Sequence, residues 1–370
     1  MARSGLLSGV VDGCLARRVL IIKTGGMGDA VLLRGALDEC ARLDSGREFA
    51  VLCGPGSRDV MGIEAKYRLH HFEPAQGHWR SALRVVKEVR AQRYDTLVDC
   101  EQFSLLSAMF GVASGIRRRL GFVPLGGAGS RARFFAGGVP FDARRSMYGN
   151  FVRLLRLIEP GLAEDFSPRP IDIGQDAVAA VQRWWEERVP REAPYVVALH
   201  LGTGPMAYKQ WPIARFAALA AEICRRAPGA VIILTGTGSD SNAVRGFCNT
   251  FDGLAVNATS LGSVAETAAL LHRCDLLVTN DTGVMHLGAS VGTPTVGLFG
   301  ATSPIQWGPL GKQSTYVFRP RVLCSPCVNT YSATRPQRCT NAVQGECMRA
   351  IEVEDVLSAA RRIVRGGWLY

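Results

Sequence analysis

Short apolar runs alternate with amphipathic stretches along the whole chain. In the first half, such runs lie at 19–22, 48–53 and 96–98. In the second half, they lie at 195–200, 231–235, 275–279 and 295–299. Buried strands that alternate with helices are typical of parallel sheets in α/β proteins. The pattern therefore predicts an α/β fold with one Rossmann-like unit in each half.

A stretch rich in proline and charge separates these halves, since residues 163–176 are AEDFSPRPIDIGQD. A chain of 370 residues also exceeds what one core usually holds. We therefore expect two domains with a linker between them. The predicted parts are an N-terminal domain over 1–165, a linker with a connecting helix over 166–190, a C-terminal domain over 191–350, and a last helical segment over 351–370 that packs back toward the domain junction.

The most informative stretch is Leu276 to Phe299, which predicts a strand, a polar turn, a short helix and a second strand. Asp281, Thr282 and Gly283 fall where the helix begins. Free backbone N–H groups, a hydroxyl and the positive end of the helix dipole meet there, which suits a phosphate. His286, on the first turn, could reach the same anion or a ribose hydroxyl. The alternative is a capped helix with a partly buried histidine.

Glycine-rich loops follow two other strands of the second half. Thr203 and Gly204 come after the run at 195–200, and Thr235 and Gly236 come at the end of the run at 231–235. Because the carboxyl ends of parallel strands lie at one edge of a sheet, these loops should line one nucleotide site. Lys209 adds a cation to this edge.

The first strand of the chain also ends in a glycine-rich loop, which contains Gly26 and Gly28. The loop does not complete the pattern GxGxxG, because Val31 occupies the place of the last glycine. A dinucleotide fingerprint is therefore disfavoured. Asp29 lies at the junction of the loop and the following helix, where it either caps that helix or carries a function.

The chain is basic, with 43 Lys+Arg against 32 Asp+Glu and a formal charge of +11. The excess is larger in the first half, where Arg117, Arg118 and Arg119 are consecutive. An anionic membrane surface or a phosphorylated substrate fits this charge. Nucleic acid is disfavoured, because aromatic residues are not interleaved with the basic ones. No apolar run predicts a membrane span or a secretory signal, so a cytoplasmic location is expected.

Four of the eleven cysteines lie close together near the end of the chain. They are Cys324, Cys327, Cys339 and Cys347. A CxxC pair with two further thiols can form a tetrahedral site for zinc or iron. Two disulfides and four reduced thiols are the alternatives. A metal would be structural. It would either hold the loop at 321–348 in place or form a contact between the subunits of a homo-oligomer.

Several segments together resemble glycosyltransferase family 9, the ADP-heptose:lipopolysaccharide heptosyltransferases. They are IIKTGGMGDAVLLRGAL, HLGTGPMAYKQWP, LTGTGSD and TNDTGVMHLGASVGTPTVGLFGATSP, in this order. The resemblance implies a GT-B architecture, in which two Rossmann-like domains face each other across a cleft. It implies an acceptor on the N-terminal domain, a nucleotide-sugar on the C-terminal domain, inversion at the anomeric carbon, and no divalent metal in the chemistry.

The resemblance also assigns roles to residues of this chain. Asp29 matches the general base, and Lys209 and Thr203 match pyrophosphate contacts. The expected donor-binding residues are Thr203, Gly204, Lys209, Thr235, Gly236, Asp281, Thr282, Gly283 and His286. The expected acceptor-side residues are Gly26, Gly28, Arg117, Arg118 and Arg119. Lys209, the helix N-terminus at Thr282 and His286 would together balance the charge of the leaving ADP.

Two positions depart from the family pattern. Asp240 is displaced from the place of an acidic residue that often holds the ribose, which leaves its role open. Residues 30–33 are AVLL, where the family commonly has a histidine soon after the aspartate. Recognition of the acceptor is therefore expected to differ from that of the inner-core enzymes.

Some members of the family carry a similar cysteine-rich insertion, which supports the metal site.

The function implied is transfer of heptose from ADP-heptose to a hydroxyl of a lipopolysaccharide core or a related anionic glycolipid. Such an enzyme would work at the cytoplasmic face of the inner membrane, with peripheral membrane contact. The alternatives are a protein or small-molecule acceptor, a GT-B-like sugar-nucleotide epimerase or hydrolase, and a nucleotide-binding scaffold without enzyme activity.

Overall fold

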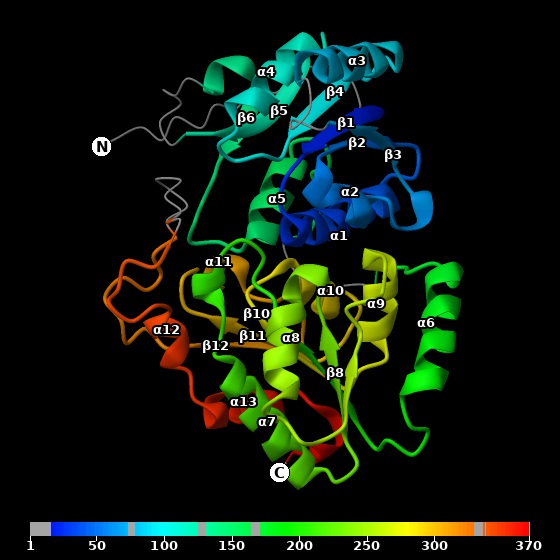
Figure 1. Ribbon diagram of the computed structural model, residues 1–370. Coiled ribbons are helices and arrows are strands. Elements are labelled where there is room, and N and C mark those ends of the chain that lie inside the picture. The colour runs from blue at the N-terminus through cyan, green and yellow to red at the C-terminus, as the bar shows by residue number, and fades with distance from the viewer. Residues whose placement is uncertain are drawn as a thin grey trace.

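The computed structural model contains two parallel β-sheets, each covered by helices and each built from one half of the chain (Figure 1). The structure describes residues 16–72, 78–124, 131–163, 171–328, 336 and 338–369. The predicted linker at 166–190 therefore lies partly outside the described residues. The predicted α/β alternation of strands and helices is confirmed.

The first sheet has six parallel strands in the order β3-β2-β1-β4-β5-β6. Its strands are β1 (Arg18–Lys23), β2 (Glu48–Cys53), β3 (Arg68–His71), β4 (Thr96–Asp99), β5 (Arg118–Val123) and β6 (Gly137–Pro140). The strand order reverses between β1 and β4. In an open parallel sheet, such a reversal leaves a crevice beyond the carboxyl ends of the two strands.

The second sheet repeats this order as β12-β11-β10-β7-β8-β9, and its strands are again parallel. Its strands are β7 (Val196–His200), β8 (Val231–Thr235), β9 (Ala255–Asn257), β10 (Leu276–Asn280), β11 (Thr295–Phe299) and β12 (Ser314–Phe318). Here the order reverses between β7 and β10. All residues of both strands are buried, which explains their unbroken apolar runs.

Helices cover both faces of each sheet. In the first half they are α1 (Met27–Leu43), α2 (Pro55–Met61), α3 (His78–Ala91), α4 (Leu105–Ala113) and α5 (Met147–Leu155), with the short helices η1 (Ile63–Ala65) and η2 (Ala132–Phe134). In the second half they are α6 (Gln175–Arg188), α7 (Ile213–Arg226), α8 (Ser241–Cys248), α9 (Val264–His272), α10 (Gly283–Ser290), α11 (Pro304–Trp307), α12 (Glu346–Arg349) and α13 (Val353–Arg361), with η3 (Ala207–Lys209), η4 (Gly238–Asp240) and η5 (Arg365–Gly367).

One hydrophobic core runs through the junction between the two halves. It includes Leu33 of α1 and Phe151 of α5 from the first half, and Leu271 of α9 and Leu287 of α10 from the second. Helix α1 packs against α10, and α2 packs against α9 (Figure 1). The two sheets are thus held by a shared layer of helices, and the carboxyl ends of their central strands are brought near each other.

The end of the chain does not pack where the sequence predicted. Helix α13 contacts α7, β11 and β12 on the face of the second sheet that points away from the first half (Figure 1). After it, Trp368 stacks on Tyr195 with a distance of 4.3 Å between ring centroids. The apolar face of α13 is therefore buried in the core of the second sheet, and the predicted packing toward the domain junction is wrong.

Among the described helices, none has both the length and the apolar character that crossing a lipid bilayer requires.

Candidate functional site

A cavity of about 600 Å³ lies between the two halves, beyond the carboxyl ends of both sheets. Its wall contains the loops that follow β1 and β4 on one side and β7 and β10 on the other. These four strands are the pairs at which the two sheets reverse their order. The predicted residues that line this cavity are Gly26, Gly28, Asp29, Thr203, Gly204, Lys209, Asp281, Thr282, Gly283 and His286.

The N-termini of α1 and α10 meet at this cavity, with glycines at the contact. A Cβ atom at position 28 would lie 2.7 Å from Cδ2 of His286 and 3.4 Å from Cα of Gly283. A Cβ atom at position 283 would lie 2.5 Å from Cε of Met27 and 3.0 Å from the backbone nitrogen of Gly28. The positive ends of two helix dipoles are therefore brought together, which favours an anion beside them.

A buried lysine organises the N-terminal wall of the cavity. The side chain of Lys23 is 2% exposed, and its Nζ lies 3.2 Å from a carboxylate oxygen of Asp29 and 3.1 Å from one of Glu101. Burial alone would lower the pKa of Lys23, but the two carboxylates outweigh burial and raise it above its ordinary value. Lys23 therefore stays charged, and it fixes Asp29 at the edge of the cavity.

Glu101 in turn holds the loop after β1. Its Oε1 accepts hydrogen bonds from the backbone N–H of Thr24 at 2.6 Å and of Gly25 at 3.1 Å. Burial tends to raise the pKa of Glu101, but Lys23 and Thr24 together lower it below the ordinary value. The glycine-rich loop is thus fastened by a carboxylate that comes from the end of β4.

On the C-terminal wall, Asp281 receives two contacts. Its Oδ2 lies 2.5 Å from Nζ of Lys209 and accepts a hydrogen bond of 2.5 Å from the hydroxyl of Thr302. All three side chains are buried. An anion bound at the N-terminus of α10 would compete with Asp281 for Lys209, so this lysine can act as the cation of the site.

His286 lines the same cavity but is not a cation there. Burial lowers its pKa to about 4, even though Asp281 acts in the opposite direction. Burial therefore keeps His286 neutral near pH 7, whereas its predicted part in balancing the charge of a phosphate stays a prediction. Its Nδ1 is buried without a hydrogen-bond partner among the described residues. A buried nitrogen of this kind can hydrogen-bond a ligand.

Thr235 and Gly236 lie outside the wall of this cavity. The hydroxyl of Thr235 is hydrogen-bonded to Nδ1 of His200 at 3.1 Å. A Cβ atom at position 236 would lie 2.9 Å from Oδ2 of Asp240. The same Oδ2 accepts a hydrogen bond of 2.8 Å from the backbone N–H of Thr237. Asp240 therefore caps its own short helix η4, and Thr235 and Gly236 support the edge of the second sheet.

The three consecutive arginines do not lie at the cavity. Arg118 and Arg119 begin β5, and they pair in register with Thr96 and Leu97 at the start of β4. That end of the sheet is opposite to the carboxyl ends that face the cavity. Arg119 donates hydrogen bonds to the backbone oxygens of Phe134 at 2.7 Å and Ile116 at 2.6 Å. None of the three arginines lines this cavity, and their predicted acceptor-side role stays a prediction.

The structure adds residues to the cavity region that the sequence did not single out. Lys23 was hidden at the end of an apolar strand, and its partner Glu101 lies 78 positions later. Gln102, Phe103, Thr302 and other residues line the wall. The signal in the sequence for the N-terminal group was the pair of acidic residues at 99 and 101, of which the first ends β4 and the second follows it.

The four clustered cysteines are free thiols in the structure. Burial, together with smaller effects of the thiols of Cys327, Cys324 and Cys339, raises the pKa of Cys347 to about 11. The four sulfur atoms are therefore close enough to influence one another. Among the residues that the structure describes, no group of three or more potential ligands is arranged to hold a metal ion. Part of the predicted loop, at 329–335 and 337, lies outside the described residues.

The cysteine-rich segment supports the C-terminal wall from behind at two points. The hydroxyl of Tyr208, next to Lys209, donates a hydrogen bond of 2.8 Å to the backbone oxygen of Pro336. The backbone N–H of Val328 donates one of 2.9 Å to Ala301, next to Thr302. The segment therefore contacts one residue next to each of the two partners of Asp281, which are Lys209 and Thr302.

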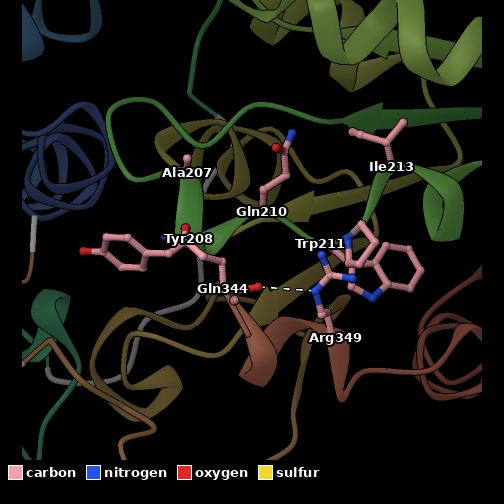
Figure 2. Close-up of a pocket in the computed structure, with 9 residues that line it drawn as sticks. Ala207, Tyr208, Gln210, Trp211, Ile213, Gln344 and Arg349 are labelled. Carbon is pink, nitrogen blue, oxygen red and sulfur yellow. Dashed lines mark hydrogen bonds between the residues drawn. The ribbon is translucent and has the colours of Figure 1, made fainter. Parts of the chain in front are cut away.

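A smaller cavity of about 200 Å³ lies behind the Lys209 loop. Figure 2 shows Gln344 and Arg349 on one side of it, with Tyr208 and Trp211 of the loop opposite. The backbone oxygen of Gln344 accepts a hydrogen bond of 3.3 Å from Nε of Arg349. This cavity is separate from the one that holds Asp29 and Asp281, and it marks the seam between the Lys209 loop and α12.

Comparisons with known proteins agree with this arrangement. Residues 82–337 match the family model described as Glycosyltransferase family 9 (heptosyltransferase). Lipopolysaccharide heptosyltransferase 1 of Pseudomonas aeruginosa is 25% identical over 344 residues, which cover 87% of this chain and 90% of that protein.

Two solved structures share the fold. E. coli ADP-heptose lps heptosyltransferase II superposes with a TM-score of 0.71 at 17% identity, covering 92% of this chain and 97% of the other. The iron-containing dodecameric glycosyltransferase TibC from enterotoxigenic E. coli superposes with a TM-score of 0.57 at 13% identity, covering 94% of this chain and 76% of the other. The architecture is therefore GT-B.

The contact between α1 and α10 can be tested with Gly28→Ala. The added Cβ would meet His286 and Gly283, so we expect the free energy of unfolding to fall by about 1–3 kcal/mol. Gly25→Ala is the matched control, because a Cβ at position 25 has nothing within 4 Å. Urea denaturation measures both variants. If the two variants were equally stable, the close contact at Gly28 would not be needed for the stability of the fold.

A second prediction concerns pH. The folded protein keeps His286 and His200 neutral, because burial lowers the pKa of each from 6.5 to about 4. Between these values the unfolded chain binds more protons, so stability should fall as the pH drops from 6.5 toward 4. His286→Gln should show a shallower fall, measured by urea denaturation at each pH. An unchanged slope would contradict the lowered pKa of His286.

Proposed function

The chain belongs to glycosyltransferase family 9, the heptosyltransferases, and from this membership we propose that it moves a heptose from ADP-heptose to a hydroxyl of a lipopolysaccharide core or related glycolipid. One observation carries the proposal. Asp29 lies on the N-terminal wall of a cavity whose opposite wall offers Lys209 and the N-terminus of α10. A carboxylate that can accept a proton thus faces groups that can hold a pyrophosphate.

The donor half of the proposal rests on the C-terminal wall. The pyrophosphate of ADP-heptose would lie at Thr282 and Gly283, where backbone N–H groups are free for an anion. Lys209 would turn from Asp281 toward the phosphate oxygens and stabilise the negative charge that grows on ADP as it leaves. His286, which burial keeps neutral near pH 7, would serve as a hydrogen-bonding group to the donor. The E. coli protein whose solved structure shares this fold is itself described as an ADP-heptose lps heptosyltransferase.

The acceptor half rests on Asp29 and the residues that hold it. The acceptor hydroxyl would attack the anomeric carbon as its proton passes to Asp29. The bond from that carbon to the phosphate oxygen would break, and its electron pair would leave with ADP. Because attack comes from the face opposite to the leaving group, the anomeric configuration would invert. Lys23 would keep the Asp29 carboxylate in place, since it is buried and ion-paired to it.

The other functions considered from the sequence are less well supported. An epimerase or hydrolase would consume the donor without an acceptor, and a scaffold would have no turnover. Membership of a glycosyltransferase family argues against both. Transfer to a protein or to a small molecule is a further outcome that an experiment can show, because the arginines predicted to contact an acceptor do not line the cavity.

We expect calorimetric titration to show tighter binding of ADP-heptose than of ADP-glucose, UDP-glucose or GDP-mannose, without turnover until an acceptor is added. Asp29→Asn should bind ADP-heptose as the wild type does, yet lose transfer by about a hundredfold or more. Lys209→Met is the matched contrast, because it should weaken donor binding itself. Transfer by Asp29→Asn at the normal rate would remove Asp29 from the mechanism. Preference for another nucleotide-sugar, or its breakdown without acceptor, would reject the proposed reaction.

We further propose that Cys324, Cys327, Cys339 and Cys347 bind one structural zinc or iron ion. The chemistry of the donor set fits, because thiolates are ligands that zinc and iron prefer, and neighbouring thiols of the cluster contribute to the raised pKa of Cys327 and of Cys347. The metal would hold the segment that contacts the neighbours of Lys209 and Thr302. It would take no part in the transfer itself.

Elemental analysis of the purified protein should then find about one zinc or iron per chain. Cys327→Ser should lose the metal and lower the melting temperature. Cys248→Ser is the control, because Cys248 is an exposed free thiol outside the cluster. A folded wild-type preparation without metal would end this proposal.

A further inference from the structure

Helix α4 has apolar side chains on its outer face as well as its inner face. Ala108 and Phe110 are buried against the first sheet. On the outside, Leu105 is 45% exposed, Leu106 57%, Met109 53% and Val112 45%. A surface helix normally turns polar residues outward, so a helix that is apolar all round indicates a further apolar environment. We call these four side chains the α4 face.

The chain around the α4 face is basic and carries no acid. Residues 102–141 contain five arginines and no aspartate, glutamate or lysine. Two of these arginines are exposed near α4. Arg117 lies two residues beyond Gly115, and Arg133 lies on the short helix η2, which packs against α4. At the end of α4, Nε of Arg90 donates a hydrogen bond of 3.0 Å to the backbone oxygen of Ala113. An apolar face beside such cations fits an anionic surface.

The α4 face is continuous with the cavity between the two halves. Phe103, two residues before α4, is 46% exposed and also lines that cavity with Gln102. Arg131 fixes this connection, because it donates hydrogen bonds to the backbone oxygens of Gln102 and Ser104, each at 3.1 Å. Its Nη2 also lies 2.6 Å from the buried Asp99. The apolar face therefore leads to the N-terminal wall, where Asp29 lies.

We propose that the α4 face docks on an anionic lipid bilayer. The four side chains would enter the boundary between headgroups and acyl chains, and the nearby arginines would meet lipid phosphates. The docking would serve the proposed function, and its biological purpose rests on that function. A glycolipid acceptor could keep its acyl chains in the bilayer while its sugar end enters the cavity past Phe103.

A second copy of the chain fits this face less well. Helix α4 has 9 residues, which makes it about 14 Å long. Alone it is too short to bury the roughly 800 Å² per partner that a stable dimer needs. Two copies joined face to face would also bring two arginine-rich, acid-free segments together, which is unfavourable. A bilayer requires neither a large area nor an opposite charge from a protein partner.

Sedimentation with vesicles tests the proposal on the full chain. One set of vesicles contains phosphatidylcholine alone, and the other contains added phosphatidylglycerol. We expect the wild type to bind the anionic vesicles more strongly, and salt to weaken this binding. Leu106→Glu and Met109→Glu should each reduce binding to anionic vesicles by about tenfold. Leu254→Glu is the matched control, because Leu254 is 49% exposed on the second half of the chain.

All variants should keep the melting temperature of the wild type, since the replaced side chains are exposed. Wild-type binding by Leu106→Glu and Met109→Glu, or no preference for anionic vesicles, would overturn the proposal. So would an oligomer of the wild type that Leu106→Glu dissociates, because the face would then be a protein interface.

The vesicle assay uses neither donor nor acceptor, so it is independent of the test of function. Transfer to an acceptor without acyl chains should be equal in the wild type and in Leu106→Glu. Transfer to the same acceptor in vesicles should fall with vesicle binding. If vesicle binding holds while no transfer occurs with either acceptor, the proposed function fails and the docking surface stands.

Discussion

The close approach of two helix N-termini, with a glycine on each side of the contact, determines the rest of the site. Gly28 of α1 and Gly283 of α10 leave just enough room for the helices to touch. This contact joins the hydrophobic layers of the two halves into one core. It also sets the distance from Asp29 on one wall to Lys209 and Thr282 on the other. A residue with a larger side chain at either position would separate the two walls.

Each half brings one buried lysine to the cavity, and each lysine is paired with carboxylate. Lys23 lies between Asp29 and Glu101, whereas Lys209 has Asp281. The two pairs differ in what they can do. Lys23 has two acidic partners, so its charge is fully used within the protein and it holds a neighbour in place. Among the described residues Lys209 has one ion-pair partner, which the phosphate of the proposed donor would replace. In the proposed reaction, the same residue type would therefore position a base on one wall and bind the leaving group on the other.

The sequence allowed correct prediction of whatever depends on neighbours in the chain. The helix that starts at Gly283 and the loop at Gly26 to Gly28 are defined by a few adjacent residues, so the pattern predicted both. Lys23 could not be found in this way, because its role comes from Glu101 on another strand. The place of Arg118 and Arg119 could not be predicted either, because only the register with β4 shows which end of β5 they occupy. The packing of α13 could not be predicted in this way either, because it depends on which apolar surface of the second sheet the other helices leave uncovered.

The contact between α1 and α10 also has a mechanical consequence. The glycines touch through van der Waals contacts, and Met27 lies over Gly283 with a flexible thioether side chain. Such contacts have no preferred direction, unlike hydrogen bonds, so α1 can roll on α10 at little cost. We expect this point to act as the pivot about which the two domains rock when a substrate enters and a product leaves, while the loops on either wall move as rigid parts.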